Sequence, residues 1–217
     1  MKIFQNKGYT MKRIRTVCIV LSMLFGFTLI SASATEHTIY QGTCLVYNEF
    51  LKSLDSQTYQ FRYDDKNKIF YFVTNDFITT GWINLTKDNL AQLRRNFEKY
   101  FEWEKTAVQN NVTLNRELPE SGFTQQVTWK FGGDWFYSKN LTLKFKFFSQ
   151  NEKRHQLVLQ TNKAPSTSNQ FITYQIEGYY FDKVQAQAFY NAITAENISK
   201  ELEKIAQKNQ VTDSLFN

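Results

Sequence analysis

The sequence has few of the residues from which metal sites, disulfides and nucleophilic active sites are built. Only two of its 217 residues are cysteines and only two are histidines, His37 and His155. Two well-separated histidines cannot assemble a histidine-rich zinc site. The chain also lacks a paired-cysteine motif, a His-x-x-x-His pair, a phosphate-binding glycine loop and a serine elbow. We therefore expect no metal, no cofactor and no catalytic residues, and the protein is more simply interpreted as a non-enzyme.

The first 34 residues have the pattern of a secretory signal peptide. Five basic residues precede a nearly unbroken apolar run from Val17 to Ile30, and Ala32 and Ala34 give the small-residue spacing that signal peptidase accepts. The apolar run is short for a membrane span, which needs roughly 20 residues. Translation from Met11 would leave a shorter signal of the same kind. We expect cleavage after Ala34, no stable transmembrane span after processing, and a secreted or periplasmic location.

Removal of this segment changes the charge of the protein. The whole chain has 26 basic and 20 acidic residues, but the signal holds five of the basic residues and none of the acidic ones. The mature chain, residues 35–217, therefore has 21 basic and 20 acidic residues and a formal charge of +1. Such a balance does not favour nucleic acid or an anionic membrane as a partner. One local excess remains, either a solvated strand face or a binding patch: Lys130, Lys139, Lys144, Lys146, Lys153 and Arg154.

Cys44 is the one cysteine left after cleavage, so the mature chain cannot form an internal disulfide. A buried, apolar role is the simpler interpretation of this side chain. The alternative, a nucleophile paired with His37 or His155, would need an activating environment.

Alternating aromatic residues predict an antiparallel sheet. Tyr59, Phe61 and Tyr63 alternate before the polar "DDKNK", and the pattern resumes at Ile69, which is typical of a hairpin. Further strands are predicted by "DFITTGWINL", by the segments from Phe123 onward, by "NLTLKFKFF", "HQLVLQ" and "FITYQIEGYY". Upstream, the spacing of Cys44, Tyr47, Leu51 and Leu54 favours a short helix, with a strand through "TCLVYNEF" as the alternative.

The period changes to a helical one at residues 87–108. Thr86 can cap this segment, and an apolar stripe of the kind that covers a sheet runs along it: Leu90, Leu93, Phe97, Phe101 and Val108. Trp103 lies off this stripe, and we place it at the edge of the packed face rather than in solvent. Asp182 and Gln185 have the spacing of a capping box for a second helix. A last amphipathic segment carries Ile198, Leu202 and Ile205.

These elements predict a single α+β domain at residues 35–217. Its antiparallel sheet would have about six to eight strands, covered by the long amphipathic helix at residues 87–108 and by C-terminal helices. Two halves, residues 35–112 and 121–210, joined by residues 113–120, show a similar order of strands and helix. This order fits a duplicated strand-strand-strand-helix unit, or only the alternation that any antiparallel α+β protein shows.

The segment "FGGDWFYSKN" is the candidate ligand site. Two glycines precede Asp134, Trp135 and Tyr137, which place a carboxylate, an indole and a phenol on a loop or strand end. Such groups suit stacking on a sugar or a peptide side chain with hydrogen bonds to its polar edge. The alternative is a hairpin whose aromatic side chains complete the core. Carboxylates elsewhere, Asp64, Asp65 and Glu177, are interpreted as turn and surface residues rather than as an acid/base pair.

We expect an exported, non-catalytic binding module for a neutral polar ligand, a glycan or a peptide. The alternatives are a structural or assembly protein of the cell envelope and a hydrolase that uses carboxylates. A pocket with two facing carboxylates would favour the hydrolase, and a large apolar patch without a pocket would favour assembly.

Overall fold

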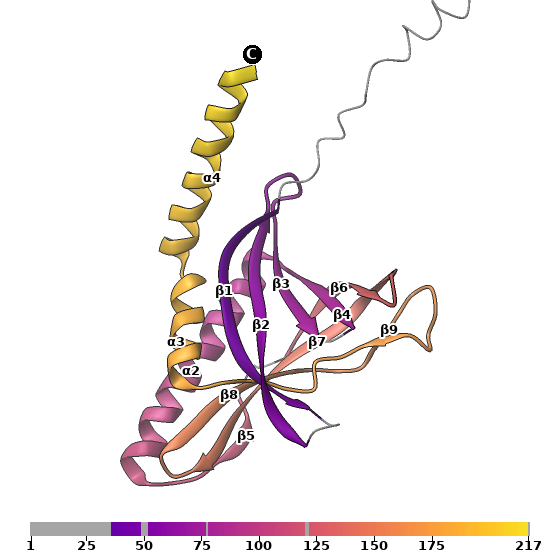
Figure 1. The fold of residues 1–217 in the computed structure, drawn as a ribbon. Helices are drawn as coiled ribbons and strands as arrows, with labels where there is room; N and C mark the ends of the chain where they lie inside the picture. The colour runs from indigo at the N-terminus through magenta and orange to yellow at the C-terminus, as the bar shows by residue number, and fades with distance from the viewer. Residues whose placement is uncertain (1–35, 49–51, 77, 120–121, 217) are drawn as a thin grey trace, which may run out of the picture. The chain divides into compact units, whose positions relative to one another are not determined.

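The computed structural model describes residues 36–48, 52–76, 78–119 and 122–216 (Figure 1). The chain divides after Ala34 into two units, and all of the described residues belong to the second one. The predicted signal peptide, residues 1–34, lies outside the described residues, so its cleavage stays a prediction. About 49% of the described residues lie in strands, so the sheet decides the fold class.

Eight antiparallel strands form a closed barrel in the order β7-β6-β4-β3-β2-β1-β11-β8, and β8 pairs with β7 to complete the ring. Strand β5 (Asn115–Glu117), within the predicted linker, pairs with β7 outside this ring, and β9 (Ala164–Pro165) and β10 (Thr173–Tyr174) form a separate two-stranded sheet. The barrel strands are β1 (Glu36–Asn48), β2 (Ser53–Asp64), β3 (Ile69–Asp76), β4 (Thr79–Leu85), β6 (Phe123–Phe131), β7 (Asp134–Asn151), β8 (Arg154–Thr161) and β11 (Tyr179–Phe181).

Strand β7 closes the barrel because its 18 residues pair along both edges. Its first half, Asp134 to Leu143, pairs with β6. Its second half, Leu143 to Asn151, pairs with β8. An open sheet would leave backbone N–H and C=O groups unpaired at its edges, whereas the closed ring pairs them internally.

The predicted open α+β sheet covered by a long helix is therefore wrong. The antiparallel strands and the helix at residues 87–108 are present, but they build a closed barrel with three helices among the described residues. Residue alternation shows which side chains share a face, and it is the same in an open sheet and in a barrel. Closure depends on distant pairings, such as that of Leu45 in β1 with Tyr180 in β11.

Of the two interpretations of the strand order, the duplicated strand-strand-strand-helix unit is wrong. Strands β2, β3 and β4 are neighbours in the barrel and precede a helix, as the first half requires. In the second half, the three strands before α3 are β9, β10 and β11, and only β11 belongs to the barrel, because β9 and β10 form a sheet of their own. The two halves therefore do not adopt the same unit.

Both predicted helix caps are confirmed. Helix α2 (Lys87–Asn110) begins after Thr86, whose hydroxyl accepts from the N–H of Asn89, and the Asn89 side chain accepts from the N–H of Thr86. Helix α3 (Lys183–Ala192) begins after Asp182 with the same reciprocal bonds to Gln185. These bonds satisfy N–H groups that have no partner inside a helix.

Phe189 of α3 connects the helices to the interior of the barrel. Its ring, which is fully buried, lies 5.0 Å from the ring of Tyr59 in β2, 5.7 Å from Phe72 in β3 and 5.4 Å from Phe97 in α2. It also contacts Phe181 in β11. An aromatic-rich core thus joins strands and helices through one side chain.

The predicted helix around Cys44 is wrong, because Cys44 lies within strand β1 and pairs opposite Gln57. The strand that we considered as the alternative is the one that forms. Cys44 is fully buried, as predicted.

Trp103 is confirmed at the edge of the packed face, since it is partly buried and contacts the ring of Phe147 at 6.0 Å. The predicted stripe packs on the core as far as Phe101, but its last residue, Val108, is 40% exposed near the end of the helix.

Helix α4 (Ala195–Phe216) contacts the barrel through one polar and several apolar residues. The predicted face, Ile198, Leu202 and Ile205, packs on the core. Further along, Asn209 Nδ2 donates to Oδ2 of Asp65 at 2.9 Å. The same oxygen lies 3.2 Å from Nε2 of His37 in β1. A short polar network therefore links α4 to the turn between β2 and β3.

Candidate functional site

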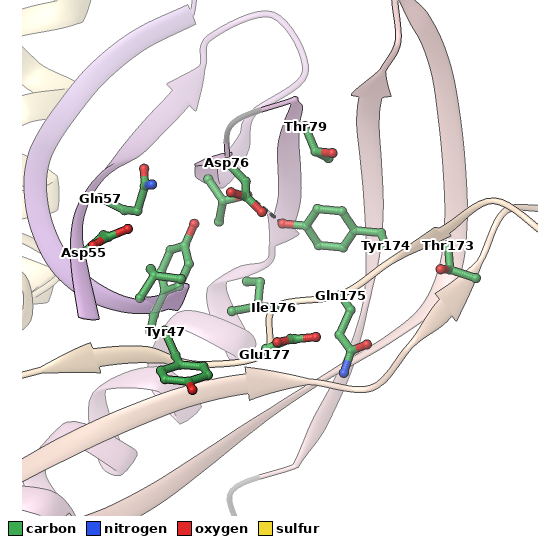
Figure 2. Close-up of a pocket in the computed structure, with 13 residues that line it drawn as sticks. Tyr47, Asp55, Gln57, Asp76, Thr79, Thr173, Tyr174, Gln175, Ile176 and Glu177 are labelled. Carbon is green, nitrogen blue, oxygen red and sulfur yellow. Dashed lines mark hydrogen bonds between the residues drawn. The ribbon is translucent and has the colours of Figure 1, made fainter. Parts of the chain in front are cut away.

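The barrel has a polar mouth that is lined by residues of several strands (Figure 2). The inward-facing side chains change from aromatic to polar towards one end of β2 and β3. In β2, Asp55 and Gln57 precede Tyr59. In β3, Phe72 precedes Thr74 and Asp76. The resulting cavity has a volume of about 400 Å³. Its lining residues are Val46, Tyr47, Asp55, Gln57, Thr74, Asp76, Thr79, Thr173, Tyr174, Gln175, Ile176, Glu177 and Tyr179.

Residues 173–177 form one wall of the mouth and are fixed to the end of β8. The N–H of Thr161 donates to the carbonyl of Ile176 at 2.9 Å, and the N–H of Ile176 donates to Oγ1 of Thr161 at 2.8 Å. Gln160 Nε2 donates to the carbonyl of Glu177 at 2.7 Å. Three hydrogen bonds thus hold in place a segment that has little regular structure of its own.

Tyr174 connects this wall to β3 and β4. Its hydroxyl lies 2.6 Å from Oγ1 of Thr74, and its ring lies against Gly81, where a Cβ atom would come within 2.5 Å of the ring. Burial raises the pKa of Tyr174 and that of Tyr179, so both phenols stay protonated at physiological pH. They are therefore neutral hydroxyl groups at the base of the mouth, and both are hydrogen-bonded to Thr74.

The mouth is acidic. Three carboxylates, those of Asp55, Asp76 and Glu177, line it together with the amides of Gln57 and Gln175 (Figure 2). No lysine or arginine occurs among the described residues that line it. Such a lining accepts hydrogen bonds from hydroxyl, amide or amino groups and repels anions. Among the described residues, no group of three or more His, Cys, Asp or Glu side chains is placed to hold a metal ion.

The predicted ligand residues lie on the β6–β7 hairpin rather than in the mouth. The turn uses Gly132 at φ 60° and Gly133 at φ 99°, which are left-handed conformations that glycine adopts without strain. Trp135 is 58% exposed, and its ring centroid lies 5.0 Å from that of Trp82 on β4. Trp135 is thus not one of the core aromatics that the alternative interpretation required.

Strand alternation separates the three predicted residues. Trp135 and Tyr137 share the outward face of β7, where Tyr137 is half-buried and its carbonyl accepts from Thr167. Asp134 precedes them at the tip of the hairpin and points to the other face, because successive strand residues alternate. The structure therefore brings Trp135 and Tyr137 together with Trp82, and it places Asp134 apart from them.

The other candidate residues have structural partners. Asp64 is buried and accepts from the N–H groups of Lys66 and Asn67 at 3.0 Å, which confirms its role in the turn. His155 is buried, with Nδ1 2.8 Å from Oγ of Ser149. Burial raises the pKa of the Cys44 thiol well above its ordinary value, which opposes formation of a nucleophilic thiolate.

The sequence analysis considered Glu177 as one of several carboxylates, but it did not predict the mouth. The signal was present in the alternation: Asp55 and Gln57 continue the inward positions of Tyr59 and Phe61, and Asp76 continues those of Phe70 and Phe72. Polar residues at the inward positions near one end of a strand indicate that the interior is open to solvent at that end. Only the closed barrel makes these ends converge.

Comparisons with known proteins add no relative: no family model, no curated protein and no solved structure matches the chain. None of the helices in the described part of the chain is long and apolar enough to cross a membrane.

Proposed function

We propose that this protein is an exported, non-catalytic binding module that holds a neutral polar ligand, a glycan or a peptide, in the mouth of its barrel. The observation that carries the proposal is the lining of the mouth. It combines three carboxylates, two amides and buried phenols, and no cationic side chain among the described residues.

The shape of the mouth supports binding of a small segment of such a ligand. A volume of about 400 Å³ lies within the range of roughly 300–1,000 Å³ that is common for ligand sites. The rigid aromatic core under the mouth keeps the lining residues in place without a ligand, which reduces the entropy lost on binding. The carboxylates supply charge-assisted hydrogen bonds that orient hydroxyl or amide donors.

The experiment screens the protein against glycan and peptide arrays and compares it with Glu177→Gln and Gln175→Ala. Both side chains are exposed at the mouth, so the variants should fold normally. Each should weaken the binding of the best array ligand by about tenfold, the loss of one hydrogen bond to a charged or polar group. Glu152→Gln is the matched control, because Glu152 is an exposed acid in the β7–β8 turn at the other end of β8. Equal affinities for the mouth variants and the control would refute the proposal.

A hydrolase is the second candidate, because the mouth contains the carboxylates that general acid/base chemistry needs. Asp76 and Glu177 are exposed, whereas an acid catalyst that stays protonated at neutral pH is normally shielded from water. Turnover of an array ligand that Asp55→Asn or Asp76→Asn abolishes, without loss of binding, would identify the hydrolase. A structural or assembly protein would be favoured by a large apolar patch without a pocket. The presence of a pocket therefore does not favour this alternative.

A further inference from the structure

Strands β4, β6 and β7 are neighbours in the barrel wall (Figure 1). Nine residues on their outer face include no acidic side chain. Strand register sets them in rows, and none of them is buried. We name them the outer array. Its rows are Thr80, Lys130 and Trp135; Trp82, Thr128 and Tyr137; and Asn84, Gln126 and Lys139.

The outer array contains three aromatic residues, and two of their rings are in contact. Trp82 and Trp135 are in contact, with ring centroids 5.0 Å apart and planes at 44°. Tyr137 is in the same row as Trp82, with Thr128 between them. Exposed flat rings on a rigid sheet can stack on the C–H faces of sugar rings at little cost in conformational entropy.

Lysines surround these rings. Lys130 lies opposite Trp135, and Lys139 follows Tyr137 on the same face of β7. A hollow of about 510 Å³ continues the array at Asn84 and Lys139, and Lys68 and Lys87 also line it. None of the four lysines forms an ion pair with a carboxylate of the described residues. Lys68 acts on the nearby Asp65 carboxylate, whose pKa its charge helps to lower, so Lys130, Lys139 and Lys87 are the charges open to an anionic ligand.

We infer that the outer array is a second binding site, independent of the mouth, for an acidic polysaccharide such as a chain of uronic acids. The aromatic rings bind the sugar faces, the lysines bind the carboxylates, and the array's threonine hydroxyls and its Asn84 and Gln126 amides bond to sugar hydroxyls. The near-zero charge of the mature chain does not oppose this site, because the lysines are concentrated on one face.

A single-stranded nucleic acid would also combine base stacking with phosphate contacts. One observation favours the polysaccharide. Non-specific binding of a nucleic acid draws essentially all of its affinity from many phosphate contacts along a positively charged groove. The outer array and its hollow offer only four lysines for such contacts, on a mature chain with a formal charge of +1.

The test measures binding of the protein to polygalacturonate and to the same polymer after reduction of its carboxyl groups. Polygalacturonate should bind, with an affinity that falls steadily between 25 and 500 mM NaCl in the assay, because salt screens exposed charges. The reduced polymer should bind at least about tenfold more weakly. Several exposed charge contacts are lost, and each contributes up to about fivefold in affinity.

Variants locate the site. Lys130→Gln with Lys139→Gln should weaken binding of polygalacturonate by about tenfold, whereas Lys105→Gln, at an exposed position of α2, should leave it unchanged. Trp135→Ala should weaken binding to both polymers, and Trp135→Tyr, which keeps a flat ring, should restore it. The mouth variant Glu177→Gln should have no effect on either polymer.

Three outcomes would overturn the inference: equal binding of both polymers, no binding of either, or tighter binding of a single-stranded oligonucleotide than of polygalacturonate. None of these outcomes tests the proposed binding at the mouth. Conversely, if no ligand on the glycan and peptide arrays binds the mouth, the inference about the outer array still stands.

Discussion

The hydroxyl oxygens of Thr74 and Tyr174 lie 2.6 Å apart in a buried hydrogen bond that joins β3 to β10 across 100 positions of the sequence. This bond fixes the inner end of the segment that forms one wall of the mouth. Tyr174→Phe removes one hydrogen-bond partner of the buried Thr74 hydroxyl, while Tyr179 remains as a second partner. We expect a loss of about 1 kcal/mol in the free energy of unfolding, measured by urea denaturation.

The matched control for Tyr174→Phe is Tyr180→Phe, because Tyr180 is half-buried and its hydroxyl makes no hydrogen bond within the described residues. Its stability should stay within about 0.5 kcal/mol of that of the original protein. A similar loss in both variants would show that the Thr74–Tyr174 bond has no special role.

Gly81→Ala should displace the Tyr174 ring from β4. The added Cβ would lie 2.5 Å from ring atoms of Tyr174, which is closer than real contacts allow. We expect a loss of about 1–3 kcal/mol in unfolding free energy, together with weaker binding at the mouth. Gly122→Ala is the control, because its Cβ would meet no atom within 4 Å. Full stability and full binding in Gly81→Ala would contradict the packing of Tyr174.

Phe189→Ala should be among the most destabilising substitutions. The ring fills the space between β2, β3, β11 and α2, and its removal leaves a cavity that these elements cannot close. We expect a loss of about 3–5 kcal/mol, measured by thermal and urea unfolding. Val184→Ala, in the same helix but 77% exposed, should change stability by less than about 0.5 kcal/mol. A mild effect of Phe189→Ala would mean that α3 does not close the core.

Asp65 should make the attachment of α4 sensitive to acid. Burial acts to raise the pKa of the Asp65 carboxyl, but the hydrogen bonds from Asn209 and His37 outweigh it, and the pKa lies below its ordinary value of 3.8. A depressed pKa contributes stability that is present above the ordinary value and is lost as the pH falls through the folded-state pKa. Asp65→Asn should therefore lower the melting temperature at pH 6, and the difference from the original protein should vanish well below pH 3.8. If the difference in melting temperature between the two proteins stays constant from pH 6 to well below pH 3.8, Asp65 does not make stability depend on pH.

Cys44 should be inert toward thiol reagents while the protein is folded. Its side chain is fully buried, and burial raises the pKa of the thiol. In a Cys18→Ser background, in which Cys44 is the one remaining cysteine, iodoacetamide at pH 8 should label the protein only after denaturant is added. Rapid labelling of the folded protein would instead place Cys44 at an accessible site.

The sequence by itself was sufficient to predict the elements whose signals are local. The helix caps at Thr86 and Asp182, the helical stripe from Leu90 to Phe97 and the aromatic alternation around Tyr59 each depend on residues within a few positions of one another. The structure confirms all of them. The same reasoning failed around Cys44, where a helical spacing and a strand were both compatible with the residues, and pairing with β2 decided for the strand.

Only the tertiary structure decided that the sheet closes and which residues meet at its mouth. Asp55, Asp76 and Glu177 belong to three segments that converge because β1 pairs with β11 and β7 pairs with β8. The outer array depends in the same way on the register of β4, β6 and β7, which sets Trp82 beside Trp135 and separates both from Asp134. Local patterns determine which face of a strand is apolar. The pairing of distant strands is a property of the whole chain, because it depends on the total burial and hydrogen bonding of the closed barrel.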